Sequence, residues 1–194
     1  MRKGICLALC LIAAGISGCQ LRGSSGKEKA ADVSPKGDGV LVAYFSHTGN
    51  TEKLAEIIAE HTGGTLFEIE TEEEYPEDYE ACVEAAAKER EEEARPKLSS
   101  HVENIEEFNI VFLGYPIWWG TVPMAVCSFA EEYDFDGKTV IPFSTHGGSG
   151  MGRSERDLSG LCEGARFLEG FSVKGSEAGA AGENVAAWLE ELER

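Results

Sequence analysis

The sequence predicts one α/β domain with a parallel sheet, and three of its features lead to this fold class. Residues 40–45 and 110–114 are unbroken apolar runs, a pattern typical of strands that are buried on both faces. Apolar residues at helical spacing follow the first run, with Leu54, Ile57 and Ile58 on one stripe. The length of 194 residues is enough for one such domain and too short for two comfortable ones.

The start of the chain has the pattern of an export signal. Arg2 and Lys3 form a basic start, and the apolar run over residues 5–16 is too short to span a bilayer as a stable helix. We therefore expect residues 1–18 to be a signal peptide.

Residues 16–19, Ile-Ser-Gly-Cys, resemble the bacterial lipobox. This resemblance implies that Cys19 becomes a diacylglycerol-modified N-terminus; the alternative is a signal peptide in which Cys19 is incidental. Residues 19–39 have almost no apolar content and predict a flexible tether. We expect an extracytoplasmic protein, held at the cell membrane or the outer membrane by its lipid anchor only.

The chain is strongly acidic, with a formal net charge of −18. Residues 1–18 hold two basic and no acidic side chains, so the chain after them carries −20. This charge disfavours nucleic acid and anionic membrane surfaces as partners. It suits redox partner proteins with basic docking surfaces, although acidic surfaces are also common without such a role.

The loop after the first apolar run has the composition of a phosphate site. Residues 46–51, Ser-His-Thr-Gly-Asn-Thr, separate the strand from a helix that we expect over residues 52–61. The N–H groups at a helix N-terminus lack intrahelical partners and attract anions. One of these side chains could be an ordinary N-cap, but three hydroxyls and an amide exceed what one cap requires. The absence of Lys favours a singly esterified phosphate over a triphosphate with magnesium.

The later elements continue the alternation of strands and helices. We expect strands at residues 65–70, 139–143 and 166–173, and helices from residue 79 to before Pro96, from near Pro123, over residues 154–161 and at the C-terminal end. In the second helix, Tyr79, Cys82, Val83 and Ala86 should point inward.

Two adjacent tryptophans, Trp118 and Trp119, follow the strand at residues 110–114. Both cannot face one interior unless the chain turns sharply, and an exposed indole is costly unless something covers it. A flat aromatic ligand would cover one of them by offset stacking. The alternative is that both pack under neighbouring loops. Trp188, by contrast, recurs at helical spacing with Val185 and Leu189 and should belong to the core.

The loop after the strand at residues 139–143 is Ser-Thr-His-Gly-Gly-Ser-Gly, over residues 144–150. Its small residues permit close approach of the backbone to the edge of a ring, with N–H groups as donors. His146 alone would be weak evidence for a ligand. Together with the two other loops it gains weight, because open α/β sheets bind ligands outside the carboxyl ends of their strands.

The cysteines after Cys19 are Cys82, Cys127 and Cys162. Three widely spaced cysteines fit neither a metal pattern nor a paired disulfide framework. We expect them to fill small apolar spaces.

Residues 46–51 resemble the phosphate loop of the flavodoxin family, S/T-x-T-G-N-T, and the three loops occur in the order expected of that family. The resemblance covers residues 40–194. It implies a short-chain flavodoxin-like domain, a three-layer sandwich with a five-stranded parallel sheet in the order 2-1-3-4-5. It also implies FMN as the cofactor and electron transfer as the function.

The resemblance assigns FMN-binding positions residue by residue. It implies phosphate contacts from Ser46, His47, Thr48, Gly49, Asn50 and Thr51. It implies contacts to the dimethylbenzene side and one ring face from Pro116, Ile117, Trp118 and Trp119, and to the pyrimidine edge from Thr145, His146, Gly147 and Gly148. Gly120 would turn its carbonyl toward N5 of the reduced flavin, which a glycine permits because both orientations are sterically open to it.

One departure from the family keeps other hypotheses open. Flavodoxins usually carry a Tyr in the loop after the fourth strand that covers the other ring face, and residues 145–150 contain none. His146 could partly replace it, or the face could be open to a substrate, as in an FMN-dependent NAD(P)H:quinone-type reductase. A third hypothesis is a cofactor-free interaction domain that kept the fold.

Overall fold

The structure is a computed structural model that describes residues 35–37 and 39–194. The predicted signal peptide, Cys19 and residues 20–34 of the predicted tether lie outside the described residues. Within the described part, no helix combines the length and the apolar character needed to cross a membrane.

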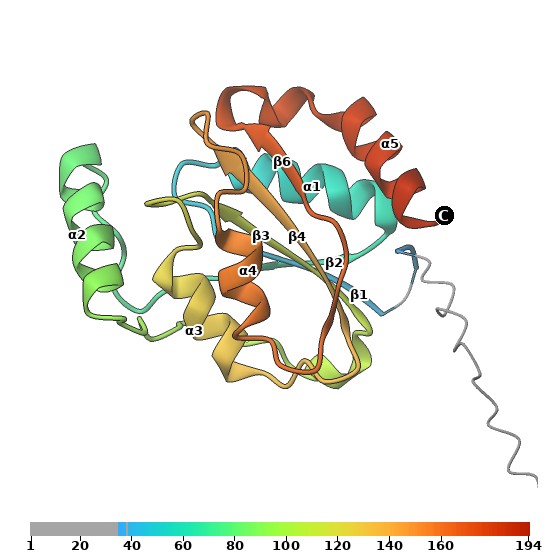
Figure 1. Cartoon of the computed structure of the whole chain (residues 1–194), viewed down its shortest axis with the longest axis horizontal. Helices are drawn as coiled ribbons and strands as arrows, with labels where there is room; N and C mark the ends of the chain where they lie inside the picture. Colours follow the sequence, from blue (N-terminus) through green and yellow to red (C-terminus); the bar gives the residue numbers. More distant parts are fainter. Residues whose placement is uncertain (1–34, 38) are drawn as a thin grey trace, which may run out of the picture. The chain divides into compact units, whose positions relative to one another are not determined.

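The described residues form one parallel sheet. Its strands are β1 (Val40–Tyr44), β2 (Thr65–Glu68), β3 (Ile110–Pro116), β4 (Thr139–His146), β5 (Arg166–Phe167) and β6 (Phe171–Lys174). They are arranged in the order β2-β1-β3-β4-β5, and β6 also pairs with β4 (Figure 1). Every pairing is parallel, which confirms the predicted sheet order.

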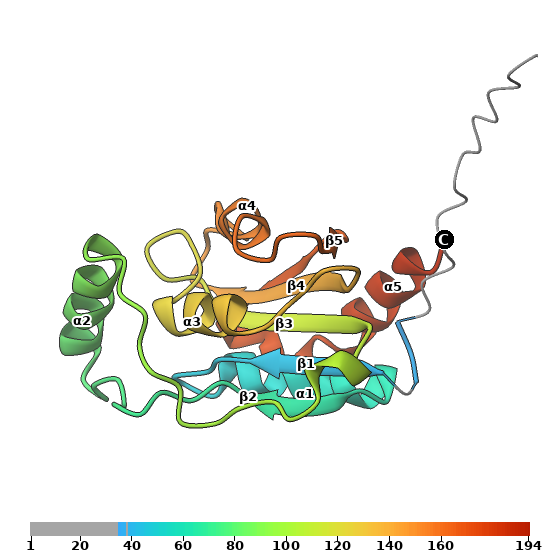
Figure 2. The ribbon, with the colours of Figure 1, turned by 90° about the horizontal axis from the view of Figure 1, so that it is seen from below.

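Helices cover both faces of the sheet. Helices α1 (Asn50–Thr62) and α5 (Gly182–Leu192) lie on one face, and α3 (Met124–Glu132) and α4 (Ser154–Ser159) lie on the other (Figure 2). Short 3₁₀ helices occur at Ile105–Glu107 and Gly175–Ala180. This arrangement confirms the predicted three-layer sandwich.

The core consists of two apolar layers, one on each face of the sheet. On one face Leu54 and Ile58 of α1 pack with Phe112 of β3, and on the other face Phe129 of α3 packs with the opposite side of the same strands. Trp188 lies in the first layer, and its indole N–H donates to the carbonyl of Glu169 at 3.1 Å. The prediction that Trp188 is a core residue is therefore confirmed.

The fifth strand differs from the prediction of a continuous strand over residues 166–173. Two short strands, β5 and β6, take its place. Val140 of β4 pairs with Phe167, whereas Phe143 pairs with Phe171. Two residues of β4 therefore stand opposite three residues of the other segment, which is a bulge of one residue.

Proline explains the position of this bulge. Pro142 of β4 lies between the two paired stretches and has no N–H to contribute to the ladder. The N–H of Gly170, in the extra segment, donates instead to the carboxylate of Glu155 at 3.1 Å. The interruption is invisible in the apolar pattern because it depends on the neighbouring strand.

Helix α2 (Tyr79–Glu91) lies beyond one end of the sheet and does not cover either face (Figures 1 and 2). The Asp78 side chain caps its N-terminus by accepting the N–H of Ala81 at 3.0 Å. Cys82 and Ala86 are buried as predicted, but Tyr79 is 80% exposed. The prediction that Tyr79 points into the core is wrong, because the first turn of α2 extends past the packed layers.

The three cysteines of the domain are buried and free, as expected. Burial raises the pKa of Cys162 to about 12, and it is also the main reason why the pKa of Cys127 rises to about 11. These thiols remain protonated at neutral pH and contribute as small apolar groups.

Candidate functional site

A cavity of about 760 Å³ lies at the carboxyl ends of β1, β3 and β4. Its walls are the loops after these strands, the segment after β6, and one side of α2. The volume is within the range of about 300–1,000 Å³ that is common for small-molecule sites. The three loops selected from the sequence thus meet at one place.

The first loop contributes His47, Thr48, Asn50 and Thr51 to the lining of the cavity. Helix α1 begins at Asn50, two residues earlier than predicted, so Asn50 and Thr51 belong to its first turn. Gly49 has a φ of 74°, a left-handed conformation that glycine adopts without strain and that sets the sharp entry into the helix. The first N–H groups of α1 therefore adjoin the cavity without intrahelical partners.

Hydrogen bonds hold this loop in place. The hydroxyl of Ser46 accepts the N–H of Glu52 at 3.2 Å and so serves as a cap of α1. The amide of Asn50 donates to the hydroxyl of Thr48 at 3.2 Å. Thr51 is buried, and its hydroxyl lies 2.8 Å from that of Thr145, which ties the first loop to β4.

The second loop separates the two tryptophans by a tight turn. Backbone hydrogen bonds of 3.0 Å run in both directions between Trp118 and Thr121. The two residues between them, Trp119 and Gly120, have φ values of 50° and 77°. Positive φ at both central positions is characteristic of a type I′ turn. This turn directs the adjacent side chains to different surroundings.

Both indoles line the cavity, but they are held differently. Trp118 is half-buried and meets Phe45, Tyr75 and His47 edge to face, with ring centres 5.4, 5.1 and 5.9 Å away. Trp119 is 49% exposed. The alternative that both tryptophans pack under neighbouring loops therefore applies to Trp118, while Trp119 remains available to a ligand.

The third loop begins later than predicted, because β4 extends to His146. Thr145, His146 and Gly147 line the cavity. The ring of His146 is oriented by its Nδ1, which accepts the N–H of Gly148 at 2.9 Å. Pro116 and Ile117 reach the cavity beside this loop, where the N–H of Ile117 donates to the Thr145 carbonyl at 2.8 Å.

The remaining predicted residues shape these loops and are not part of the described lining of the cavity. They are Ser46, Gly49, Gly120 and Gly148. The carbonyl of Gly120 accepts the N–H of Arg153 at 3.0 Å. A turn of this peptide toward the cavity would have to break that hydrogen bond.

The family model for flavodoxin matches residues 39–192. The chain belongs to the flavodoxin family.

Solved structures resemble this flavodoxin over most of its length. A candidate flavoprotein from Bacteroides uniformis is 34% identical, with a TM-score of 0.71, and the match covers 80% of this chain and 99% of that one. A second, from Bacteroides eggerthii, is 32% identical, with a TM-score of 0.70, and the match covers 81% of this chain and 99% of that one. A flavoprotein in complex with FMN from Lactobacillus acidophilus shares the fold at 19% identity, with a TM-score of 0.61 and coverage of 73% and 96%. None of the curated proteins matches the chain.

Two groups of lining residues in this flavodoxin were missed by the sequence analysis. The first is Lys174, the last residue of β6, together with Gly175 and Ser176, which follow it. Gly175 approaches Asn50 so closely that a Cβ added to Gly175 would lie 3.1 Å from Nδ2 of the Asn50 side chain. Among the described lining residues Lys174 is the only lysine or arginine. The first loop itself lacks a lysine, but β6 supplies one to the same cavity.

The second group is Glu77 together with four residues of α2, namely Tyr79, Cys82, Val83 and Ala86. No signal in the sequence places α2 at the ends of the strands. For Lys174 a signal existed, because it stands at the carboxyl end of a predicted strand, where ligands of such sheets bind.

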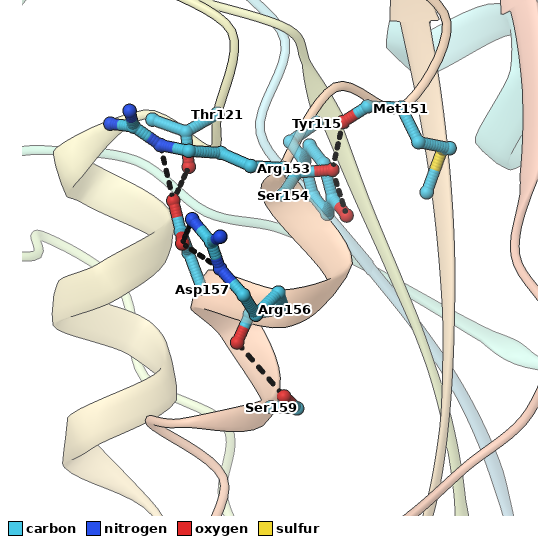
Figure 3. A network of polar contacts seen from close by, with 8 residues as sticks. All are labelled: Tyr115, Thr121, Met151, Arg153, Ser154, Arg156, Asp157 and Ser159. Carbon is cyan, nitrogen blue, oxygen red and sulfur yellow. Dashed lines mark hydrogen bonds and ion pairs between the residues drawn. The ribbon is translucent and has the colours of Figure 1, made fainter.

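A polar network on the α4 side braces the second loop (Figure 3). The hydroxyl of Thr121 and the Nε of Arg153 each donate to Asp157 at 2.7 Å. The hydroxyl of Tyr115 donates to Ser154 at 3.1 Å, and Ser154 donates to the Met151 carbonyl at 2.6 Å. The end of β3, the tryptophan turn and α4 are therefore linked.

Burial and acidic neighbours perturb several groups near the cavity. Burial is the main reason why the pKa of Tyr44 rises to about 12, and nearby carboxylates, Glu68 foremost, add to it. Burial likewise raises the pKa of Tyr75, whose hydroxyl donates to Glu89 at 2.8 Å. Burial and Glu89 raise the pKa of the Cys82 thiol, so this lining residue is not a thiolate nucleophile at neutral pH.

Proposed function

We propose that this flavodoxin binds FMN in the cavity and transfers electrons. The observation that carries the proposal is that one cavity joins the first turn of α1 to the exposed indole of Trp119. A helix N-terminus is an anion site, and an indole is a stacking surface for a flat ring. FMN combines these two chemistries, and the related flavoprotein from Lactobacillus acidophilus contains it.

The lining residues fit FMN part by part. Thr48, Asn50 and Thr51 offer hydroxyl and amide groups to the phosphate, and Lys174 offers a positive charge. Trp118 and Trp119 offer aromatic surface to the ring system. The backbone around Thr145 to Gly147 offers donors to its polar edge. When bound, FMN supplies one- and two-electron transfer, and the protein supplies binding and orientation.

The direct test is titration of the purified protein with FMN, followed by absorption and flavin fluorescence. We expect a yellow protein in which the indoles quench the flavin fluorescence. A parallel titration with riboflavin, which lacks the phosphate, is the comparison. Unchanged fluorescence at saturating protein would contradict the proposal and would favour the hypothesis of an interaction domain without a cofactor.

The proposed location is outside the cytoplasm, with Cys19 as the lipid anchor. The support is the signal-like pattern of residues 1–18 and the Ile-Ser-Gly-Cys sequence at residues 16–19. The proposed partners are redox proteins with basic docking surfaces, because the chain after residue 18 carries a charge of −20. The anchor alone would hold the protein at the cell membrane or the outer membrane.

A reductase of small acceptors is the second candidate, and the missing tyrosine after β4 favours it. For a carrier, we expect stepwise reductive titration to resolve two one-electron steps. The negative charge of the chain and the exclusion of water by the indoles would both disfavour the anionic, fully reduced flavin that the second electron produces. A single two-electron step, with rapid turnover of NADH or NADPH and a quinone, would favour the reductase.

The same reductive titration on the Gly120→Val variant tests whether the tryptophan turn contributes to the separation of the two one-electron steps. At a φ of 77°, valine is strained even though open space surrounds the position. We expect the two reduction potentials to move closer together, because valine would penalise the turn of the residue-120 carbonyl toward N5 of the reduced flavin. Gly137→Val is the matched control, since Gly137 has a φ of 73° and similarly open surroundings in a turn away from the cavity lining.

A further inference from the structure

Helix α2 presents an apolar stripe to the cavity. Its lining residues Tyr79, Cys82, Val83 and Ala86 are spaced at i, i+3, i+4 and i+7, so they share one side of the helix. Cys82 and Ala86 are buried and Val83 is half-buried, whereas Tyr79, at the N-terminal end of the stripe, is 80% exposed. An aromatic ring at the mouth of a cavity is an apolar surface on which a ligand can stack.

Contacts near its middle and its C-terminal end fix α2 against the tryptophan turn. The indole N–H of Trp119 donates to the carbonyl of Val83 at 3.4 Å, and the guanidinium of Arg90 lies 5.3 Å from the centre of the same ring. The hydroxyl of Tyr75 donates to the carboxylate of Glu89, the residue before Arg90, at 2.8 Å. The stripe is therefore a positioned wall of the cavity, continuous with Trp119.

The charges divide the cavity into two parts. Lys174, the only lysine or arginine among the described lining residues, is the last residue of β6 and precedes Gly175, which approaches Asn50 of the predicted phosphate loop. The α2 side has the carboxylate of Glu77 instead. Residues 72–93, which carry α2, contain 11 acidic and two basic side chains. An anion is favoured at the first part and repelled at the second.

These observations point to a second ligand with a different chemistry from FMN. We propose that the α2 stripe forms a binding site, beside the flavin site, for a planar uncharged aromatic molecule that stacks on Tyr79. This inference rests on the proposed function, because the flavin would form the opposite boundary of the site. The proposed site would bind neutral aromatic compounds and exclude anionic ones.

Calorimetric titration of the oxidised, FMN-loaded protein with hydroxymethyl anthraquinone tests the proposal. The fused rings of an anthraquinone leave no ring position for addition of the Cys82 thiol, so only reversible binding is measured. Anthraquinone sulfonate is the matched anionic probe. We expect the sulfonate to bind at least about tenfold more weakly, and Glu77→Gln to narrow that difference.

Variants of α2 identify the stacking residue. Tyr79→Ala should weaken binding of the neutral anthraquinone about five- to tenfold, and Tyr79→Phe should retain it within about twofold, because the ring and not the hydroxyl makes the contact. Glu80→Ala, on the same turn but outside the cavity lining, is the control and should change neither affinity. FMN affinity should be the same in all three variants.

Several outcomes would overturn the proposal. Equal affinity for the two anthraquinones, or no binding of either, would contradict the proposed site. A loss of FMN affinity in Tyr79→Ala would place Tyr79 against the flavin itself. Light scattering that showed a dimer dissociated by Tyr79→Ala would make a second copy of the chain the occupant. If FMN does not bind but the anthraquinone still depends on Tyr79, the flavin assignment fails and the α2 site stands.

Discussion

At the scale of single residues, the turn of Trp119 and Gly120 gives two adjacent indoles different surroundings. A tryptophan with a φ of 50° is uncommon, and such a conformation costs about 1–3 kcal/mol unless its surroundings hold it. Here the Val83 carbonyl and the Arg90 guanidinium hold the indole. Because of the turn, Trp119 lies outside the aromatic cluster of Trp118, so both indoles line the cavity but Trp119 is the more exposed of the two.

The phosphate loop leads to a prediction at this scale. Thr48→Ala combined with Asn50→Ala should weaken FMN far more than riboflavin, because only FMN carries the phosphate. Each lost hydrogen bond to a charged group is worth about 1.5–3 kcal/mol, or roughly tenfold or more in affinity. Fluorescence titrations with both ligands measure the ratio. Thr65→Ala, an exposed position on β2, is the control, and equal weakening of both ligands would place the phosphate elsewhere.

At the scale of elements, short segments rely on their neighbours. Helix α4 has only six residues, too few to be stable alone. Its Asp157 accepts hydrogen bonds from Thr121, Arg153 and Arg156, which joins the helix to the tryptophan turn (Figure 3). Although partial burial raises the pKa of Asp157, these hydrogen bonds outweigh it and hold the pKa below its ordinary value.

This network predicts a dependence of stability on pH. Because the pKa of Asp157 is lower in the folded state, its contribution is present above the unfolded value of about 3.9 and disappears as pH falls through the folded pKa. Asp157→Asn should therefore lower the free energy of unfolding by about 1 kcal/mol at pH 7. Urea unfolding at several pH values should show the difference shrinking in acid. A difference that did not change with pH would mean that packing, not charge, is responsible.

At the scale of the whole molecule, acidity and anchoring act together in the proposed function. In that proposal, Cys19 would hold the domain near a membrane. Its negative charge would keep it from lying on an anionic surface and would leave the cavity edge open to partners.

The anchor can be tested by one substitution. Cys19→Ser should move the protein from the membrane fraction to the soluble fraction, because residues 20–39 have almost no apolar content that could hold it there. Fractionation followed by immunoblotting measures this. Cys82→Ser, at a buried position of the domain, is the control for loss of a cysteine as such. Unchanged membrane association of Cys19→Ser would contradict a lipid anchor.

The sequence by itself determined the fold class and the loops that meet at the cavity, and its resemblance to the flavodoxin family implied the sheet order. The fold class and the loops depend on local patterns: an unbroken apolar run marks a central strand, and small polar residues after it mark a strand end near a helix N-terminus. Because parallel strands end at one edge, residues such as Thr48, Trp119 and Thr145 could be brought together without coordinates. The core position of Trp188 followed in the same way from helical spacing.

Only the tertiary structure decided the features that depend on a neighbour distant in sequence. The bulge between β5 and β6 arises opposite Pro142, on another strand. Lys174 lines the same cavity as residues 47–48 and 50–51, and the next residue, Gly175, closely approaches Asn50. Helix α2 has the pattern of a core helix, yet its stripe lines the cavity because Trp119 and Arg90 hold it at the end of the sheet. Periodicity shows which side of a helix is apolar, but only packing shows what that side faces.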